Sequence, residues 1–215
     1  NKALMEQMRD DLEVMTYEYE DMQLDLTALQ NEKIAAMNEA ISTKEGYQAM
    51  LDAEEAASEQ AAAFIKEYLA TSGDDGLYYD GATFLWPLPS SWGVNWITSD
   101  YGNRYHPISG SYSFHTGIDI AADGGTPIYA ADDGKIIYRG WLGGYGETIQ
   151  ISHGDGLTTL YGHMSAYGSY MVDDYVAAGD IIGYVGTTGN STGNHLHFEV
   201  RLNGDHTNPR TYLGI

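Results

Sequence analysis

Residues 193–200 read GNHLHFEV, and this stretch decides the fold class of the C-terminal half of the chain. Apolar and polar side chains alternate strictly from His195 to Val200, which is the pattern of a β-strand with one apolar face. The other face carries two imidazoles, those of His195 and His197. That face is either an ordinary solvated surface or part of a polar site in which histidines bind metal or transfer protons. The rest of the sequence has to decide between the two.

The whole segment from residue 84 to residue 215 has the same strand-like character. Short apolar runs are separated by Gly, Asn and Asp at intervals typical of β sandwiches and barrels. The clearest runs are GKIIYRGW (134–141), GETIQISH (146–153), DIIGYVG (180–186) and HLHFEVR (195–201). We therefore predict an all-β, mainly antiparallel sheet or sandwich domain over residues 84–215.

The first 70 residues differ sharply in composition. Of the 26 glycines only Gly46 precedes residue 72, and all 5 prolines follow it. Residues 1–70 are rich in Ala, Glu, Met, Leu and Gln, which are strong helix formers. The sequence thus predicts an α+β multidomain chain, with a helical coiled-coil region at 1–70, a linker at 71–83 and the β domain at 84–215.

An apolar seam runs along the first part of the helical region. Its members alternate at spacings of three and four residues over four heptads, which predicts a coiled coil. They are Met5, Met8, Leu12, Met15, Tyr19, Met22, Leu26 and Leu29. The heptad frame then fails, so we expect a register change near Asn31, or a break there or at Gly46. The seam can pack on the chain's own β domain, but its regularity favours a helical partner or self-association.

Charge and cysteine content exclude several classes of function. The chain has 10 basic and 31 acidic residues, a formal net charge of −21, which argues against nucleic-acid partners and anionic membrane surfaces. No apolar run reaches 18 residues, so we expect no membrane span in these 215 residues. Because the sequence has no cysteine, a metal site has to use His and carboxylate ligands.

A second histidine motif lies in SFHTGIDIA, residues 113–121. His115 and Asp119 are separated by β-branched residues and Gly117, which makes a helix improbable, and four residues of straight strand span about 13 Å. A kink at Gly117 would bring the two side chains to one ion. With one of the two strand histidines they complete a three-ligand set for zinc that leaves a position for water. The other strand histidine and His163 are then candidates for proton transfer.

Several blocks of the β half together resemble the lysostaphin/LytM-type zinc endopeptidases, which cleave the peptide part of bacterial peptidoglycan. The resemblance runs from about Trp86 to Leu213, in that family's order and spacing. The blocks are YGNRYHP (101–107), FHTGIDIAA (114–122), GTPIYAADDGKI (125–136), YGHMS (161–165), AAGDIIGYVGTTGNSTGNHLHFEVR (177–201) and NPRTYL (208–213).

The resemblance implies a role for each site residue. It assigns one zinc ion per chain to His115, Asp119 and His197, and it makes His163 and His195 the catalytic pair. It implies a secreted zinc endopeptidase that acts on peptidoglycan cross-links or stem peptides, restrained or positioned by the coiled coil. The expected location is the envelope or exterior of a bacterium, with the leader peptide absent from these residues. The alternative is a non-catalytic activator or scaffold for other cell-wall hydrolases in cell division.

The remaining polar residues of the β half have simpler interpretations. We expect a groove that binds an extended peptide, with His106 shaping a loop at its rim. We expect Arg104 to make a structural hydrogen bond. His153 follows a strand and His206 lies in a turn, so both are predicted to be surface residues.

Overall fold

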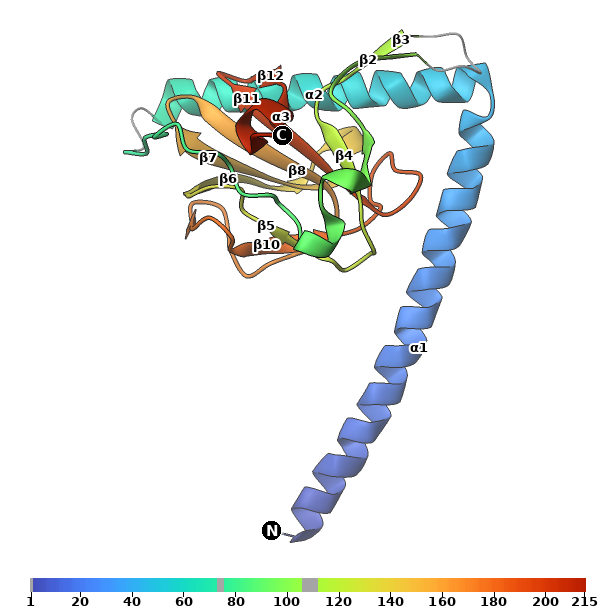
Figure 1. The fold of residues 1–215 in the computed structure, drawn as a ribbon. Helices are drawn as coiled ribbons and strands as arrows, with labels where there is room; N and C mark the ends of the chain where they lie inside the picture. The colour runs from blue at the N-terminus through green and yellow to red at the C-terminus, as the bar shows by residue number, and fades with distance from the viewer. Residues whose placement is uncertain (1, 73–75, 106–111) are drawn as a thin grey trace. The chain divides into compact units, whose positions relative to one another are not determined.

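The computed structural model describes residues 2–72, 76–105 and 112–215 of the chain (Figure 1). It divides into two compact units, Asn1–Glu39 and Ala40–Ile215. The first unit consists of most of helix α1 (Lys2–Ile41). The seam residues of this helix from Met5 to Leu29 are all exposed. The fold class is confirmed as an N-terminal helical part followed by a mainly antiparallel β domain, whereas the coiled coil stays a prediction.

The helical half breaks once within its described residues, and the position differs from the expected one. Helix α1 continues through Asn31 and ends at Ile41, and helix α2 (Lys44–Ser72) follows. Thr43 caps α2, because its side-chain oxygen accepts the backbone N–H of Gly46 at 3.0 Å. The break therefore lies at residues 42–43 and not at Asn31 or Gly46, whereas a register change near Asn31 within the continuous helix stays a prediction. Gly46 is accommodated inside the first turn of α2.

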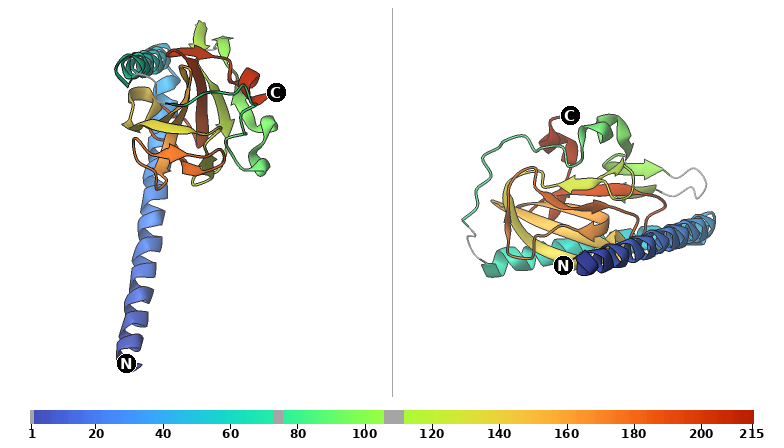
Figure 2. Two further views of the ribbon diagram at one scale, coloured as in Figure 1. Left: turned by 90° about the vertical axis from the view of Figure 1, so that its left-hand side faces the viewer. Right: turned by 90° about the horizontal axis from the view of Figure 1, so that it is seen from below.

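Helix α2 belongs to the same compact unit as the β strands. Its buried apolar residues recur at helical spacing and form one face; they are Tyr47, Leu51, Ala57, Ala61 and Ile65. Ala57 and Ala61 pack in one cluster with Leu142, Tyr145 and Leu160. Figures 1 and 2 show α2 alongside the strands. The change in composition near residue 72 therefore does not coincide with the structural division at residues 39–40, because α2 buries its apolar face on the β domain.

The β strands form one large sheet and one small one. The large sheet has ten strands in the order β1-β4-β11-β8-β7-β6-β9, with β10 beside β5 and β8 and with β12 beside β11. The small sheet pairs β2 with β3, and every named pairing is antiparallel. The strands up to β6 are β1 (Ile97–Ser99), β2 (Gly102–Tyr105), β3 (Tyr112–His115), β4 (Ile118–Ala121), β5 (Pro127–Tyr129) and β6 (Gly134–Trp141). The later ones are β7 (Glu147–Gly154), β8 (Leu157–Tyr167), β9 (Tyr175–Val176), β10 (Ile181–Val185), β11 (His195–Leu202) and β12 (Asp205–Thr207).

Short helices complete the domain: η1 (Ser90–Trp92), η2 (Val94–Trp96), η3 (Gly143–Tyr145) and α3 (Pro209–Leu213). The main core is aliphatic and aromatic, with Ile118, Ile120, Leu196, Phe198 and Val200 contributed by the central strands β4 and β11. These residues are the apolar halves of the alternating patterns seen in the sequence. The other face of the same strands is left for polar side chains. Among the described residues, no helix has both the length and the apolar character needed to cross a membrane.

Candidate metal centre and active site

The motif His115-x-x-x-Asp119 folds as two strands joined by a sharp change of direction. Strand β3 ends at His115 in the small sheet, and β4 begins at Ile118 in the large sheet beside β11. Gly117 lies between them against β11, where an added Cβ would come within 2.4 Å of the carbonyl oxygen of Phe198. Only glycine allows this close approach of the two backbones. The bend at Gly117 that the sequence predicted is therefore confirmed. His115 Nε2 consequently lies 3.1 Å from Asp119 Oδ1.

Strand β11 brings His197 to the same two residues. His197 pairs directly with Asp119 of β4, and its Nδ1 lies 2.8 Å from Asp119 Oδ1 and 3.2 Å from His115 Nε2. His115 and His197 are almost fully buried. His115, Asp119 and His197 are the group among the described residues whose ligand atoms converge closely enough to hold a metal ion.

The proton positions on these imidazoles suit a metal site. The Nδ1 of His115 lies 3.0 Å from the carbonyl oxygen of Asp100, which can only accept, so Nδ1 donates and Nε2 presents a lone pair. Likewise the Nε2 of His197 donates to Glu199 at 3.0 Å, which leaves Nδ1 free to act as a ligand. Around an ion about 2.0–2.1 Å from its ligands, tetrahedral ligand atoms lie about 3.3 Å apart. The observed spacings of 2.8–3.2 Å are shorter than this by about 0.1–0.5 Å, so a small separation of the three side chains makes room for such an ion.

The charges in the buried cluster favour a cation. Burial would raise the pKa of the Asp119 carboxyl, but in the metal-free cluster the adjacent imidazoles of His115 and His197 outweigh burial and hold that pKa well below its usual range. Burial lowers the pKa of His197, yet its hydrogen bonds to Asp119 and Glu199 outweigh this and raise that pKa to about 10. Asp119 and Glu199 thus keep both nitrogens of the His197 ring protonated when no metal is present. A bound metal ion would replace the proton on Nδ1, the nitrogen that faces Asp119.

His163 and His195 lie beside this cluster. Their ring centroids are 4.6 Å apart, and the ring centroids of His163 and His197 are 5.9 Å apart. The Nδ1 of His163 donates to the carbonyl of Thr188 at 2.8 Å, and the Nδ1 of His195 donates to that of Gly193 at 2.9 Å. Each ring therefore keeps a lone pair on Nε2, and the Nε2 of His195 lies 3.7 Å from Asp119 Oδ1.

The backbone at His163 is irregular although it lies within strand β8, which continues to Tyr167. His163 has a φ of +60°, and the pairing of β8 with β7 shifts register between Tyr161 and Met164. This bulge separates His163 from the regular ladder. Burial and the two neighbouring imidazoles lower the pKa of His163 well below its usual value, so its ring is neutral near pH 7.

Helix α2 covers part of the site. A pocket of about 110 Å³ is lined by Met50 and Glu54 of α2. The same pocket is lined by the possible metal ligands, called the ligand cluster below (His115, Asp119 and His197), and by His163 and His195. Glu54 accepts two hydrogen bonds from Arg104 Nη2, at 2.7 and 3.0 Å. Arg104 also donates to Ser99 and Ser113, so its expected structural role is extended by an ion pair with α2.

The structure corrects two of the simpler interpretations. His153 is buried, with Nδ1 donating to the carbonyl of Asp133 at 2.7 Å and Nε2 2.8 Å from Thr159 Oγ1. The predicted surface position was wrong because the strand β7 on which it lies is covered on both faces. His206 is half-buried, stacked on Phe114 and bonded to Tyr101. His106 lies outside the described residues.

Comparison with known proteins identifies the domain. The profile of peptidase family M23 matches residues 113–209. The catalytic domain of lysostaphin from Staphylococcus simulans superposes with a TM-score of 0.52 and 36% sequence identity, over 60% of this chain and 99% of that domain. This chain belongs to peptidase family M23. The family resemblance in the sequence blocks is thereby confirmed.

Two M23 relatives carry more specific names. The DD-carboxypeptidase/endopeptidase Mpg of Neisseria meningitidis is 49% identical over 113 residues, which cover 53% of this chain and 26% of Mpg. The peptidoglycan DD-endopeptidase ShyC of Vibrio cholerae is 39% identical over 116 residues, 54% of this chain and 27% of ShyC. The chain therefore spans about a quarter of the length of these curated relatives.

Some residues of the M23 site were not predicted from the sequence. Tyr145 stacks on the His197 ring, with centroids 5.0 Å apart, and its hydroxyl donates to Glu199 at 2.6 Å. No local motif marks Tyr145, since it comes from the short helix η3. Glu199 did carry a signal, because it lies two residues after His197 on the polar face of the predicted strand. Glu54 is distant in sequence and carried no signal.

Proposed function

We propose that this chain is a secreted zinc endopeptidase that hydrolyses peptide bonds in the cross-links or stem peptides of bacterial peptidoglycan. The observation that carries the proposal is the convergence of His115 Nε2, Asp119 Oδ1 and His197 Nδ1, which lie 2.8–3.2 Å from one another. The peptidoglycan endopeptidase name of the V. cholerae relative supports the substrate class. The same substrate implies action in the envelope or exterior of a bacterium.

In this mechanism His115, Asp119 and His197 would hold one zinc ion per chain. When bound, zinc supplies a Lewis acid for the scissile carbonyl and lowers the pKa of a bound water. His163 and His195 hold and move protons through their Nε2 atoms, because their Nδ1 atoms are engaged with backbone carbonyls. The lowered pKa of His163 keeps its ring neutral near pH 7, so its Nε2 is unprotonated at the start of the reaction. We assign both histidines to proton transfer without dividing the acid and base roles.

Helix α2 restrains the proposed enzyme. Ligand sites usually have volumes of about 300–1,000 Å³, whereas the pocket at the ligand cluster measures about 110 Å³ with Met50 and Glu54 as part of its wall. A peptide substrate therefore needs the part of α2 near Glu54 to shift. This refines the idea of a restraining coiled coil, because the restraint is assigned to α2.

The exposed seam of α1 supports a second part of the proposal, namely pairing with another helix, either of a second copy or of a partner protein. A helix with an exposed apolar stripe gains most of its stability from packing that stripe. Sedimentation of the full chain and of a Leu12→Lys/Leu26→Lys variant tests self-association. The matched control is Val14→Lys/Leu24→Lys, which changes exposed apolar residues outside the seam. A seam variant that sediments as the wild type does would contradict self-association.

Digestion of purified peptidoglycans of different cross-bridge chemistry, followed by mass spectrometry of the released peptides, tests the activity. We expect new peptide termini from at least one substrate, and none when a chelator is present. The test uses the zinc-loaded wild type and the zinc-loaded Glu54→Ala variant, in which the restraint by α2 is weakened. If neither protein cuts any peptidoglycan, the result would support the alternative of a non-catalytic activator or scaffold.

A further inference from the structure

A buried ion pair lies directly behind the metal ligand His197. Glu199 and Arg201 follow His197 at two-residue steps on β11, so the three side chains share one face of the strand. Both charged residues are almost completely buried, at 0% and 1% exposure. Glu199 Oε2 accepts a hydrogen bond from Arg201 Nε at 2.6 Å. Burying two charges costs free energy, so the position of this pair needs an explanation.

The second oxygen of Glu199 is directed at the metal ligand. Glu199 Oε1 accepts from His197 Nε2 at 3.0 Å, from Tyr145 at 2.6 Å and from Thr116 Oγ1 at 2.5 Å. An ionised carboxylate only accepts, so the His197 ring must carry its proton on Nε2. The opposite nitrogen, Nδ1, is thereby turned towards Asp119.

We propose that Glu199 is the positioning residue for the metal ligand His197, an inference that rests on the proposed zinc peptidase function. Histidine ligands commonly donate their second N–H to a carboxylate, which fixes the ring orientation and raises the basicity of the ligand nitrogen. Tyr145 assists from the side, because its ring stacks on His197 at an angle of 20° while its hydroxyl bonds the same carboxylate.

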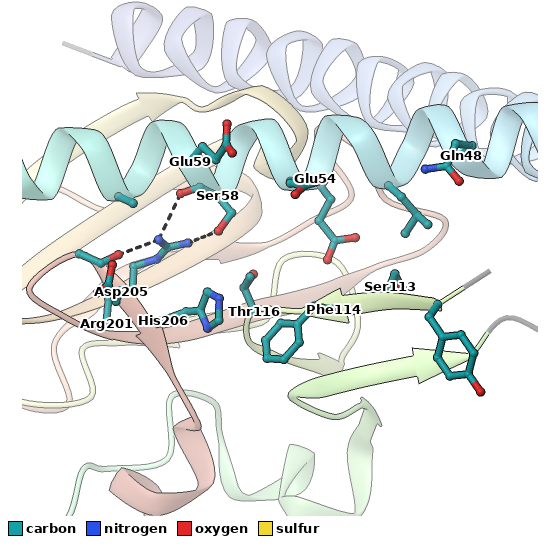
Figure 3. A pocket seen from close by; sticks show the side chains of 15 residues that line it. Gln48, Glu54, Ser58, Glu59, Ser113, Phe114, Thr116, Arg201, Asp205 and His206 are labelled. Carbon is teal, nitrogen blue, oxygen red and sulfur yellow. Dashed lines mark hydrogen bonds between the residues drawn. The ribbon is translucent and has the colours of Figure 1, made fainter.

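Arg201 holds Glu199 in place and connects it to helix α2. Its Nη1 donates to the carbonyls of Ser58 and Gly204 at 3.2 and 3.1 Å, and its Nη2 donates to Ser58 Oγ at 2.7 Å (Figure 3). Figure 3 shows Ser58 on α2 facing the guanidinium of Arg201. An unbroken series of hydrogen bonds thus runs from α2 through Arg201 and Glu199 to His197.

Stability alone does not explain this arrangement. Apolar residues of similar volume can often replace a buried ion pair with little loss of stability, or with a gain. The feature that apolar residues cannot reproduce is the acceptor presented to the His197 Nε2 proton. The position of Glu199 therefore points to the ligand and not to the packing of the domain.

The test measures zinc affinity by chelator competition on the full chain and its Glu199→Gln variant. We expect the variant to bind zinc about 10–100-fold more weakly, because the amide cannot accept from both His197 and Arg201 as the carboxylate does. The matched control, Asp205→Asn, removes an exposed carboxylate that pairs with Lys66 and touches no ligand, and it should bind zinc as the wild type does.

A second readout separates positioning from a merely structural role. Both proteins are saturated with cobalt(II), and their visible absorption is compared at full occupancy. A shifted cobalt spectrum in Glu199→Gln is expected, because a reoriented His197 ring changes the geometry around the ion. Native zinc affinity together with an unchanged cobalt spectrum in a folded Glu199→Gln protein would overturn the proposal.

If the glutamine variant does not fold, the double variant Glu199→Leu/Arg201→Leu removes the whole ion pair and avoids a lone buried charge. This protein should fold and still bind zinc more weakly than the wild type, whereas native affinity would overturn the proposal. Because the readouts are metal binding and its spectrum, they stand even if the wild-type chain cuts no peptidoglycan. That last outcome would contradict the proposed function alone.

Discussion

Glu54 of helix α2 and Arg104 of strand β2 form an ion pair beside His115, Asp119 and His197, in which Arg104 Nη2 lies 2.7 and 3.0 Å from the two carboxylate oxygens of Glu54. The two residues are 50 positions apart, and both line the pocket that contains His115, Asp119 and His197. Their side chains are only partly exposed, at 18% and 30%. The pair is therefore placed to hold α2 against the site.

Breaking this pair should raise the activity of the proposed enzyme. A partly exposed pair contributes up to about 1 kcal/mol, so Glu54→Ala should increase the rate of peptidoglycan hydrolysis by up to about fivefold. The measurement is the initial rate of release of soluble peptides. Glu59→Ala, also on α2 but outside this pocket, is the matched control and should leave the rate unchanged. An unaltered or lower rate in Glu54→Ala would contradict restraint by α2.

Loss of a ligand should remove the metal. Asp119→Ala eliminates the carboxylate that lies between His115 and His197, so zinc affinity should fall by more than the roughly 10–100-fold caused by losing an outer hydrogen bond. The zinc content of the purified, dialysed protein provides the measurement. His163→Ala should keep nearly full occupancy, and a fully loaded Asp119→Ala protein would refute the ligand assignment.

The histidine pair should matter for catalysis more than for binding. His163→Ala and His195→Ala should each lower the rate of hydrolysis by about 10²–10⁴-fold, as expected for loss of a general acid or base. His206→Ala serves as a control, because that side chain contacts Tyr101 and Phe114 away from the pocket. Rates are compared at equal zinc occupancy. Near-native hydrolysis by either pair variant would exclude that residue from proton transfer.

The buried His153 should make the fold sensitive to acid. Burial lowers the pKa of His153 from 6.5 to about 4. Between these two values the unfolded chain binds a proton that the folded chain does not, so the free energy of unfolding decreases as the pH falls through this window. The loss is on the order of 3 kcal/mol and is complete near pH 4. Above about pH 6.5 His153 contributes no pH dependence.

Urea unfolding of the wild type and of His153→Gln, at pH 7 and pH 5 with a chelator present, checks this prediction. The chelator removes the contribution of metal release, and the difference between the two proteins isolates His153 from the other titrating groups. The wild type should lose more stability than the variant between the two pH values. Equal losses would mean that the folded chain protonates His153 readily.

Local patterns in the sequence predicted the parts of the molecule that local geometry determines. Alternation predicted the strand from His195 onward, and the glycine in the His115 motif predicted the bend that joins it to Asp119. The break in the helix was misplaced because the register of the seam says nothing about capping, whereas Thr43 supplies the cap. These are interactions between neighbours in the chain.

Features that depend on distant segments could not be predicted in this way. The apolar face of α2 identifies an amphipathic helix but not the strands on which it packs. The contact of Glu54 with Arg104, and that of Ser58 with Arg201, follow from this docking. The burial of His153 similarly depends on Phe84 and on the strand that carries Thr159.

The left-handed backbone of His163 has a consequence for how the domain evolves. The described non-glycine residues with positive φ are Asp155, Asp173, Asn203 and His163. Asp and Asn tolerate this conformation comparatively well, but a larger side chain pays about 1 kcal/mol. Glycine or asparagine at position 163 would relieve this backbone strain but would discard the imidazole. Relief of strain alone would thus favour a residue other than histidine, so retention of histidine at this position would indicate selection for its imidazole.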